Sequence, residues 1–174
     1  GNRAGDPKYK WSEALPGGQI YRYDPAAGRA AVFANLPPAR CTATCLLDRP
    51  RNIWWAYLEA GQGCALYGLD MATKKPVFQS PDGAVGHYRN FAIAHDGAVY
   101  FNGPKGSLWK YDPATKTIAA THTTFGAETE AMRCSSRESK DGWIYGVTLR
   151  SFQLFRYAPA KDVLEYLGPV FLQG

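Results

Sequence analysis

Three arginines in separate parts of the chain are the residues best suited to bind a charged ligand. They are Arg40, Arg89 and Arg133, which are 49 and 44 residues apart, and each is expected just before a strand. A guanidinium group binds a carboxylate or a phosphate through two parallel hydrogen bonds, and several such groups together create a positive potential. If the chain brings them together, these arginines and the neighbouring amide of Asn90 form a site for an anionic ligand.

Beside the second arginine, His87 and Tyr88 are candidates for catalysis. An imidazole or a phenol exchanges protons near neutral pH once its pKa is adjusted, and a neighbouring arginine neutralises a substrate carboxylate. The alternative is structural: His87 caps a loop, and each arginine pairs with an acid of a neighbouring repeat, such as Glu128 or Glu130.

Other chemistries lack their motifs. The sequence contains no P-loop, no G-x-S-x-G and no H-E-x-x-H motif, and we expect neither a cofactor nor a metal site. The pair Cys41 and Cys45 has no nearby histidine or second close cysteine pair, so it supports a zinc site only weakly. The four cysteines are therefore expected to be buried thiols, although one disulfide stays open as an alternative.

The elements that must position these residues are visible as an internal repeat. Four segments share a pattern of alternating apolar and polar residues followed by a turn, and their turns begin at 24, 70, 112 and 158, which are 46, 42 and 46 residues apart. Alternation with a period of two predicts half-buried strands rather than helices. The residues Asp24, Asp70, Asp96, Asp112 and Asp141 are expected to form turns, and Gly or Pro directly follows four of them. Four antiparallel strands per repeat are typical of a propeller blade.

The segment Ser107-Leu108-Trp109-Lys110-Tyr111-Asp112-Pro113-Ala114-Thr115-Lys116, which follows an Asp-Gly turn and a strand, resembles β-propellers of the NHL, kelch, gluconolactonase and quinoprotein kind. The resemblance covers residues 15–171 and implies an all-β fold. It leaves the activity open, because these propellers share turns and strands but differ in function. Some polysaccharide lyases are propellers, so a lyase acting on uronate is the alternative function, with Arg89 and Arg133 holding the carboxylate.

We predict a single propeller-type domain over residues 1–174. It contains a partial blade at 15–36 and whole blades at 38–80, 86–122 and 130–171. Propellers close with four to eight blades, and incomplete rings expose strand edges that pair with other chains. The N-terminal segment can close a small ring, a second copy can complete it, or the chain can be part of a larger propeller.

Composition limits the class of partner. Aromatic residues make up 14% of the 174 residues and hydrophobic residues 45%, enough for a core, and no apolar stretch is long enough for a membrane helix. The net charge of +5 has no basic run, which argues against nucleic acid. We expect a binding or scaffolding module for an anionic small molecule or acidic saccharide, secreted or periplasmic; the other alternative is a purely structural set of blades.

Overall fold

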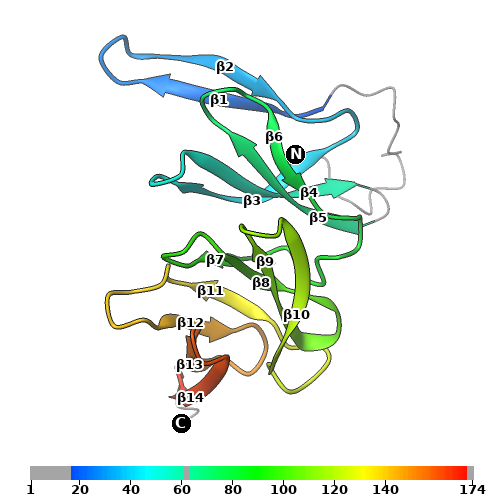
Figure 1. Ribbon diagram of the computed structural model, residues 1–174, viewed down its shortest axis with the longest axis vertical. Helices are drawn as coiled ribbons and strands as arrows, with labels where there is room; N and C mark the ends of the chain where they lie inside the picture. The colour runs from blue at the N-terminus through cyan, green and yellow to red at the C-terminus, as the bar shows by residue number, and fades with distance from the viewer. Residues whose placement is uncertain (1–16, 61–62, 172–174) are drawn as a thin grey trace.

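The computed structural model describes residues 17–60 and 63–171, which form three four-stranded antiparallel sheets and one two-stranded hairpin. The predicted all-β fold is confirmed. The sheets follow one another in chain order from the top to the bottom of Figure 1, like successive blades. In the described part of the chain the one helical element is a short 3-10 turn, η1 (Pro104–Gly106).

The hairpin and the sheets have simple up-and-down order. The hairpin pairs β1 (Gln19–Asp24) with β2 (Arg29–Asn35). Each sheet orders its strands as they occur in the chain. Sheet 2 contains β3 (Cys41–Asp48), β4 (Ile53–Ala60), β5 (Gly63–Asp70) and β6 (Pro76–Gln79). Sheet 3 contains β7 (Phe91–Ile93), β8 (Val99–Asn102), β9 (Ser107–Asp112) and β10 (Thr117–Thr124). Sheet 4 contains β11 (Met132–Ser135), β12 (Ile144–Thr148), β13 (Gln153–Ala158) and β14 (Val163–Pro169).

The turn before the last strand repeats in the hairpin and in sheets 2 and 3. Asp24, Asp70 and Asp112 each accept a hydrogen bond from the backbone N–H two residues later, at 2.9, 2.8 and 2.8 Å. The carboxylates of Asp96 and Asp141 accept the same kind of bond in their own turns. The prediction that these five acids form turns is therefore confirmed, since a short acidic side chain can satisfy the backbone of a tight turn.

The core lies between successive sheets, and the period of two decides which neighbour a residue contacts. In sheet 3, the odd-numbered Phe91 and Phe101 pack towards sheet 2, whereas the even-numbered Ala92 and Tyr100 pack towards sheet 4. Alternate side chains of a strand point to opposite faces, so a sheet between two others is apolar on both. Trp54 and Trp55 illustrate the same rule, because they belong to the clusters on opposite faces of sheet 2.

The cysteines correct an expectation. Cys64 is buried and Cys41 half-buried, but Cys45 and Cys134 are exposed, and all four are free thiols. The two exposed thiols lie on β3 and β11, which end their sheets and are covered by a partner strand on one side only. The general expectation of buried thiols is therefore wrong for these two.

Candidate functional site

The loop that carries His87, Tyr88, Arg89 and Asn90 is held from both neighbouring sheets. The Thr44 hydroxyl of β3 lies 3.0 Å from the carbonyl oxygens of both Tyr88 and Arg89. The Tyr57 hydroxyl of β4 donates to the carbonyl of Asn90 at 2.8 Å. These bonds fix the backbone of the loop, so its side chains are presented in a set direction.

On the other side, Asn102 at the end of β8 joins this loop to sheet 4. Its amide nitrogen donates to the carbonyls of His87 at 3.3 Å and Met132 at 3.0 Å, and its amide oxygen accepts from the Met132 N–H at 2.7 Å. The side chain is buried, at 1% exposure. A buried amide with both ends bonded holds a unique arrangement, because any other orientation leaves polar groups unpaired.

His87 lies in an electropositive setting. Burial lowers the pKa of His87 below the usual value of 6.5, and the positive charges of Arg89 and Arg150 lower the pKa further. The imidazole is therefore uncharged at neutral pH. Its Nδ1 atom is buried and has no hydrogen-bond partner among residues 17–60 and 63–171. The ring stacks on Tyr88, with centroids 5.5 Å apart and planes inclined by 4°.

The three predicted arginines have different surroundings. Arg40 forms a two-pronged ion pair with Asp82, with nitrogen–oxygen distances of 2.6 and 2.8 Å. The hydrogen bond from Arg40 lowers the pKa of the Asp82 carboxyl, so the pair is charged at neutral pH. Arg40 thus pairs with an acid, as the structural alternative expects. The acid is Asp82 rather than Glu128 or Glu130.

Arg89 and Arg133 form no ion pair with any acid in the part of the chain that the structure describes. Arg133 lies over the Phe152 ring, 5.3 Å from its centroid. It is the second residue of β11 rather than a residue before the strand, which corrects the predicted placement. Both side chains are exposed, so their guanidinium groups are accessible to a ligand.

Arg150 was not anticipated from the sequence and belongs to the same region. It lies in the loop between β12 and β13, two residues before Phe152, and its Nε donates to the Thr129 carbonyl at 3.2 Å. Its backbone N–H donates to Glu130 at 2.8 Å. No repeat position marks Arg150, since the repeated segments align on strands rather than on this loop.

Glu130 contacts the loop that carries Arg150. Burial would raise its pKa, but hydrogen bonds from the N–H groups of Arg150 and Ser151 outweigh burial and lower the pKa. The carboxylate is therefore ionised, and it accepts hydrogen bonds from the backbone of the loop that carries Arg150. Arg89 and Arg150, whose positive charges both act on His87, are therefore not neutralised by an ion pair with Glu130 in the part of the chain that the structure describes.

Asn90, the fourth predicted ligand-binding residue, connects two sheets. Its amide nitrogen donates to the Ser135 hydroxyl of β11 at 2.6 Å. Arg89 and Asn90 thus lie in one fixed loop with His87 and Tyr88, and the positive charge of Arg150 contributes to lowering the pKa of His87. Arg40 is directed to Asp82. Whether any of these residues binds a ligand stays a prediction.

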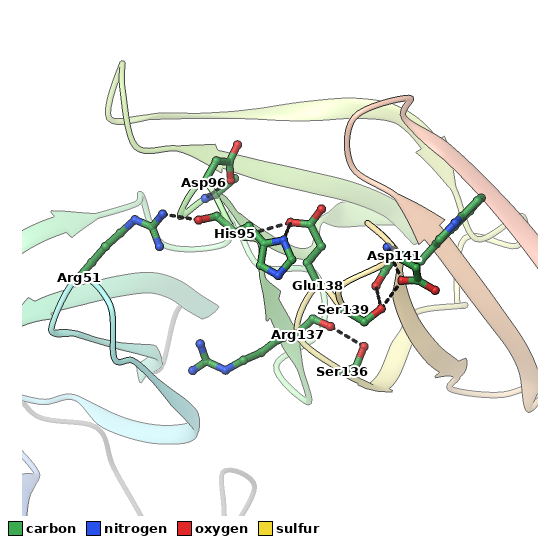
Figure 2. A network of polar contacts seen from close by, with 10 residues as sticks. Arg51, His95, Asp96, Ser136, Arg137, Glu138, Ser139 and Asp141 are labelled. Atoms are coloured by element: carbon green, nitrogen blue, oxygen red, sulfur yellow. Dashed lines mark hydrogen bonds and ion pairs between the residues drawn. The ribbon is translucent and has the colours of Figure 1, made fainter.

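At the β3–β4, β7–β8 and β11–β12 turns, a second polar network links the three sheets. Figure 2 shows the Arg51 guanidinium directed at the His95 carbonyl, and Glu138 accepting from His95. Arg137 extends away from Glu138 and donates to the Leu47 carbonyl of sheet 2. These hydrogen bonds run between residues of different sheets, so the network joins the sheets.

Comparisons with known proteins bear on the fold alone. The sequence matches no family model and none of the curated proteins. Its structure is similar to the extracellular domain of a putative one-component system from B. thetaiotaomicron, with a TM-score of 0.60 and 15% sequence identity. The match covers 85% of this chain but 19% of that one, so this chain spans about a fifth of its neighbour's length. No relative supports the NHL or kelch families in particular.

Two further observations concern the described residues. No helix among them is long and apolar enough to cross a membrane. No group of three or more His, Cys, Asp or Glu side chains among them is arranged to hold a metal ion.

Proposed function

We propose that the protein is a ligand-binding module whose ligand is an anionic molecule bearing a carboxylate. The observation that carries this proposal is the fixed loop that presents Arg89 beside an uncharged His87, with Arg150 close enough to affect the pKa of the same imidazole. Arg133 adds a third guanidinium, which already stacks on Phe152. The backbone beneath Arg89 is held before binding, so little backbone freedom remains to be lost when an anion binds.

Citrate and D-galacturonate are suitable first probes, observed by NMR as shifts of backbone amides. We expect both to shift the amides of residues 87–90 and 150–152 and to bind more weakly as salt is added. Arg89→Gln and Arg133→Gln should each weaken binding about tenfold, which corresponds to about 1.4 kcal/mol. Arg29→Gln, an exposed arginine of β2, is the matched control and should leave binding unchanged. Binding that is insensitive to Arg89→Gln and Arg133→Gln overturns the proposal.

A second function, lyase activity on a uronate polymer, is favoured by one observation. An uncharged imidazole next to an arginine can accept the proton α to a carboxylate that the arginine neutralises. Incubation with polygalacturonate would then produce unsaturated ends that absorb in the ultraviolet. His87→Ala and Tyr88→Phe should abolish this signal, while galacturonate binding persists. If the unmodified protein gives no such signal, the lyase function is ruled out and the binding function is the proposal that remains.

We also propose that the sheets are blades of a propeller that acts outside the cytoplasm. Its blade-like sheets and a structural neighbour that is an extracellular domain support this proposal. A second copy or the remainder of a longer chain would complete the ring. Light scattering distinguishes the two, because a mass near twice 19.2 kDa supports a second copy. Fractionation of cells that express the full-length protein tests the compartment.

A further inference from the structure

The interface between sheets 2 and 3 is filled at a position where the interface between sheets 3 and 4 is open. In sheet 2, Trp55 pairs with Gly68, and Gly68 pairs with Phe78. In sheet 3, the equivalent row consists of Tyr100, Lys110 and Ala119. Each row lies on the face directed towards the following sheet.

Side-chain size explains the difference. Trp55 lies so close to Gly68 that a Cβ there would be 2.8 Å from the indole ring. The next sheet supplies Tyr111, whose ring is 4.8 Å from Trp55 and 4.5 Å from Phe78. In the second interface the equivalent Tyr157 packs on Tyr100 at 5.2 Å, but Ala119 has no ring to take the place of Phe78.

The result is a pocket of about 330 Å³ between the outer strands of sheet 3 and the β13–β14 turn of sheet 4. That volume is within the range of sites for small molecules, about 300–1,000 Å³. Six of the residues that line it determine its chemistry: Tyr100, Lys110, Asp112, Thr117, Tyr157 and Asp162.

One wall of the pocket is rigid. Asp162, at the turn position where the earlier repeats have Gly28, Lys74 and Lys116, accepts hydrogen bonds from the His122 N–H at 2.6 Å, the Thr123 hydroxyl at 2.9 Å and the Tyr157 hydroxyl at 2.9 Å. These bonds join sheets 3 and 4 at this wall of the pocket. The pocket is thus part of the folded interface rather than a gap between loose loops.

The opposite side offers polar groups of both kinds. The Lys110 ammonium lies 3.6 Å from the Asp112 carboxylate, so a hydrogen-bond donor and an acceptor stand side by side with no net charge. The hydroxyl of Thr117 is 2.8 Å from that of Thr115 and can donate or accept. With Asp162 included, the lining carries no excess of positive charge, which disfavours an anion here.

The geometry points to a second binding site, for a small uncharged polyhydroxylated molecule such as a single sugar unit. Such a ligand has an apolar C–H face for the tyrosine and alanine surface. Its hydroxyls would accept a hydrogen bond from Lys110, donate one to Asp112 and do either with Thr117. This inference is independent of the anion site, which lies on other loops.

Backbone amide NMR with D-glucose, D-galactose and D-mannose, each raised to about 50 mM, tests the inference at the millimolar affinity typical of weak sites. We expect at least one sugar to shift the amides of Tyr100, Lys110 and Thr117 and to leave residues 87–90 unchanged. Ala119→Phe, which copies Phe78, should weaken binding at least tenfold. Ala31→Phe, the same substitution at an exposed position of β2, should have no effect.

Thr117→Val keeps the side-chain shape and removes one hydroxyl, so it should weaken sugar binding while the protein stays folded. Arg89→Gln should leave sugar binding unchanged, which separates this site from the anion site. Absence of any shift at Tyr100, Lys110 and Thr117 with all three sugars overturns the inference. Shifts that survive Ala119→Phe overturn it as well.

Discussion

The interface between sheets 2 and 3 and the interface between sheets 3 and 4 are packed with side chains of different size. The first is filled by large aromatic rings, including the fully buried Trp55, Tyr57 and Phe91. The second contains Ala92, Ala94 and Ala98 of sheet 3 among its rings, and it has the pocket beside Ala119.

Hydrogen bonds cross both interfaces, and those of the first include bonds from Thr44 and Tyr57. Asn102, Asn90 and Asp162 each connect sheet 3 with sheet 4 through hydrogen bonds of 3.0 Å or less. Burial of rings is non-directional, whereas hydrogen bonds fix direction and register. A repeated backbone can thus fill one interface with aromatic rings and leave a pocket in the next.

Removal of an indole should have the largest effect. Trp55 is 1% exposed at the centre of the aromatic cluster, so Trp55→Ala should lower the free energy of unfolding by about 3–5 kcal/mol. Tyr100→Ala, at the equivalent position beside the pocket, should cost less, about 2 kcal/mol. Urea unfolding of both variants measures the contrast. Equal losses would show that the two interfaces are packed alike.

Asn102→Ala should have the next largest effect. It removes the amide that pairs with the backbone of Met132 and leaves those buried groups without partners, at a cost of about 2–3 kcal/mol. Asn35→Ala, an exposed asparagine of β2, is a control that should stay within about 0.5 kcal/mol of the unmodified protein. Hydrogen exchange should locate the loss, since the amide of Met132 would exchange faster.

Asp162→Asn should have a smaller and pH-dependent effect. Burial would raise the pKa of Asp162, but hydrogen bonds from His122, Thr123 and Tyr157 outweigh burial and lower the pKa. A carboxyl with a lower pKa in the folded state stabilises the fold above its unfolded pKa, and this stability is lost as the pH falls through the folded pKa. Unfolding at neutral pH should become easier by about 1–2 kcal/mol in the variant.

The pH dependence itself provides the control for that prediction. The difference between the variant and the unmodified protein should shrink as the pH falls below the usual carboxyl range, about 4. A difference that stays constant from neutral to acidic pH would show that charge on Asp162 does not matter for the second interface.

The smallest effect is expected for the polar network at the opposite turns. The His95 imidazole is 63% exposed and 3.5 Å from Glu138, so His95→Ala should change the free energy of unfolding by less than about 0.5 kcal/mol. Glu138→Ala should cost more, because the His95 N–H then loses its acceptor. If the two variants are equally destabilised, the imidazole rather than the backbone bond joins the sheets.

The sequence predicts local structure well, because strands and turns depend on near neighbours. Alternation predicted the strands of sheet 3, and the acid-containing turns are formed by Asp24, Asp70 and Asp112 as expected. Both signals lie within a few residues, where the pleat and the turn backbone decide which side chain fits.

The candidate site was only partly predictable because its partners come from distant parts of the chain. Arg40 pairs with Asp82, 42 residues later, and no local pattern distinguishes it from the exposed Arg89. Asn102 resembles an ordinary strand-end residue in the sequence, yet it holds the loop and the next sheet. Such choices depend on the distance between sheets, which becomes known only once the sheets are packed.

The loop before β7 is held by its carbonyl oxygens, which Thr44, Tyr57 and Asn102 bind. Every amino acid carries the same carbonyl, so the side chains at 87–89 can be exchanged while these bonds remain. For evolution and for engineering, this separates the shape of the loop from its chemistry. Selection can then change the chemistry that the loop presents at these three positions without changing the contacts that hold its backbone.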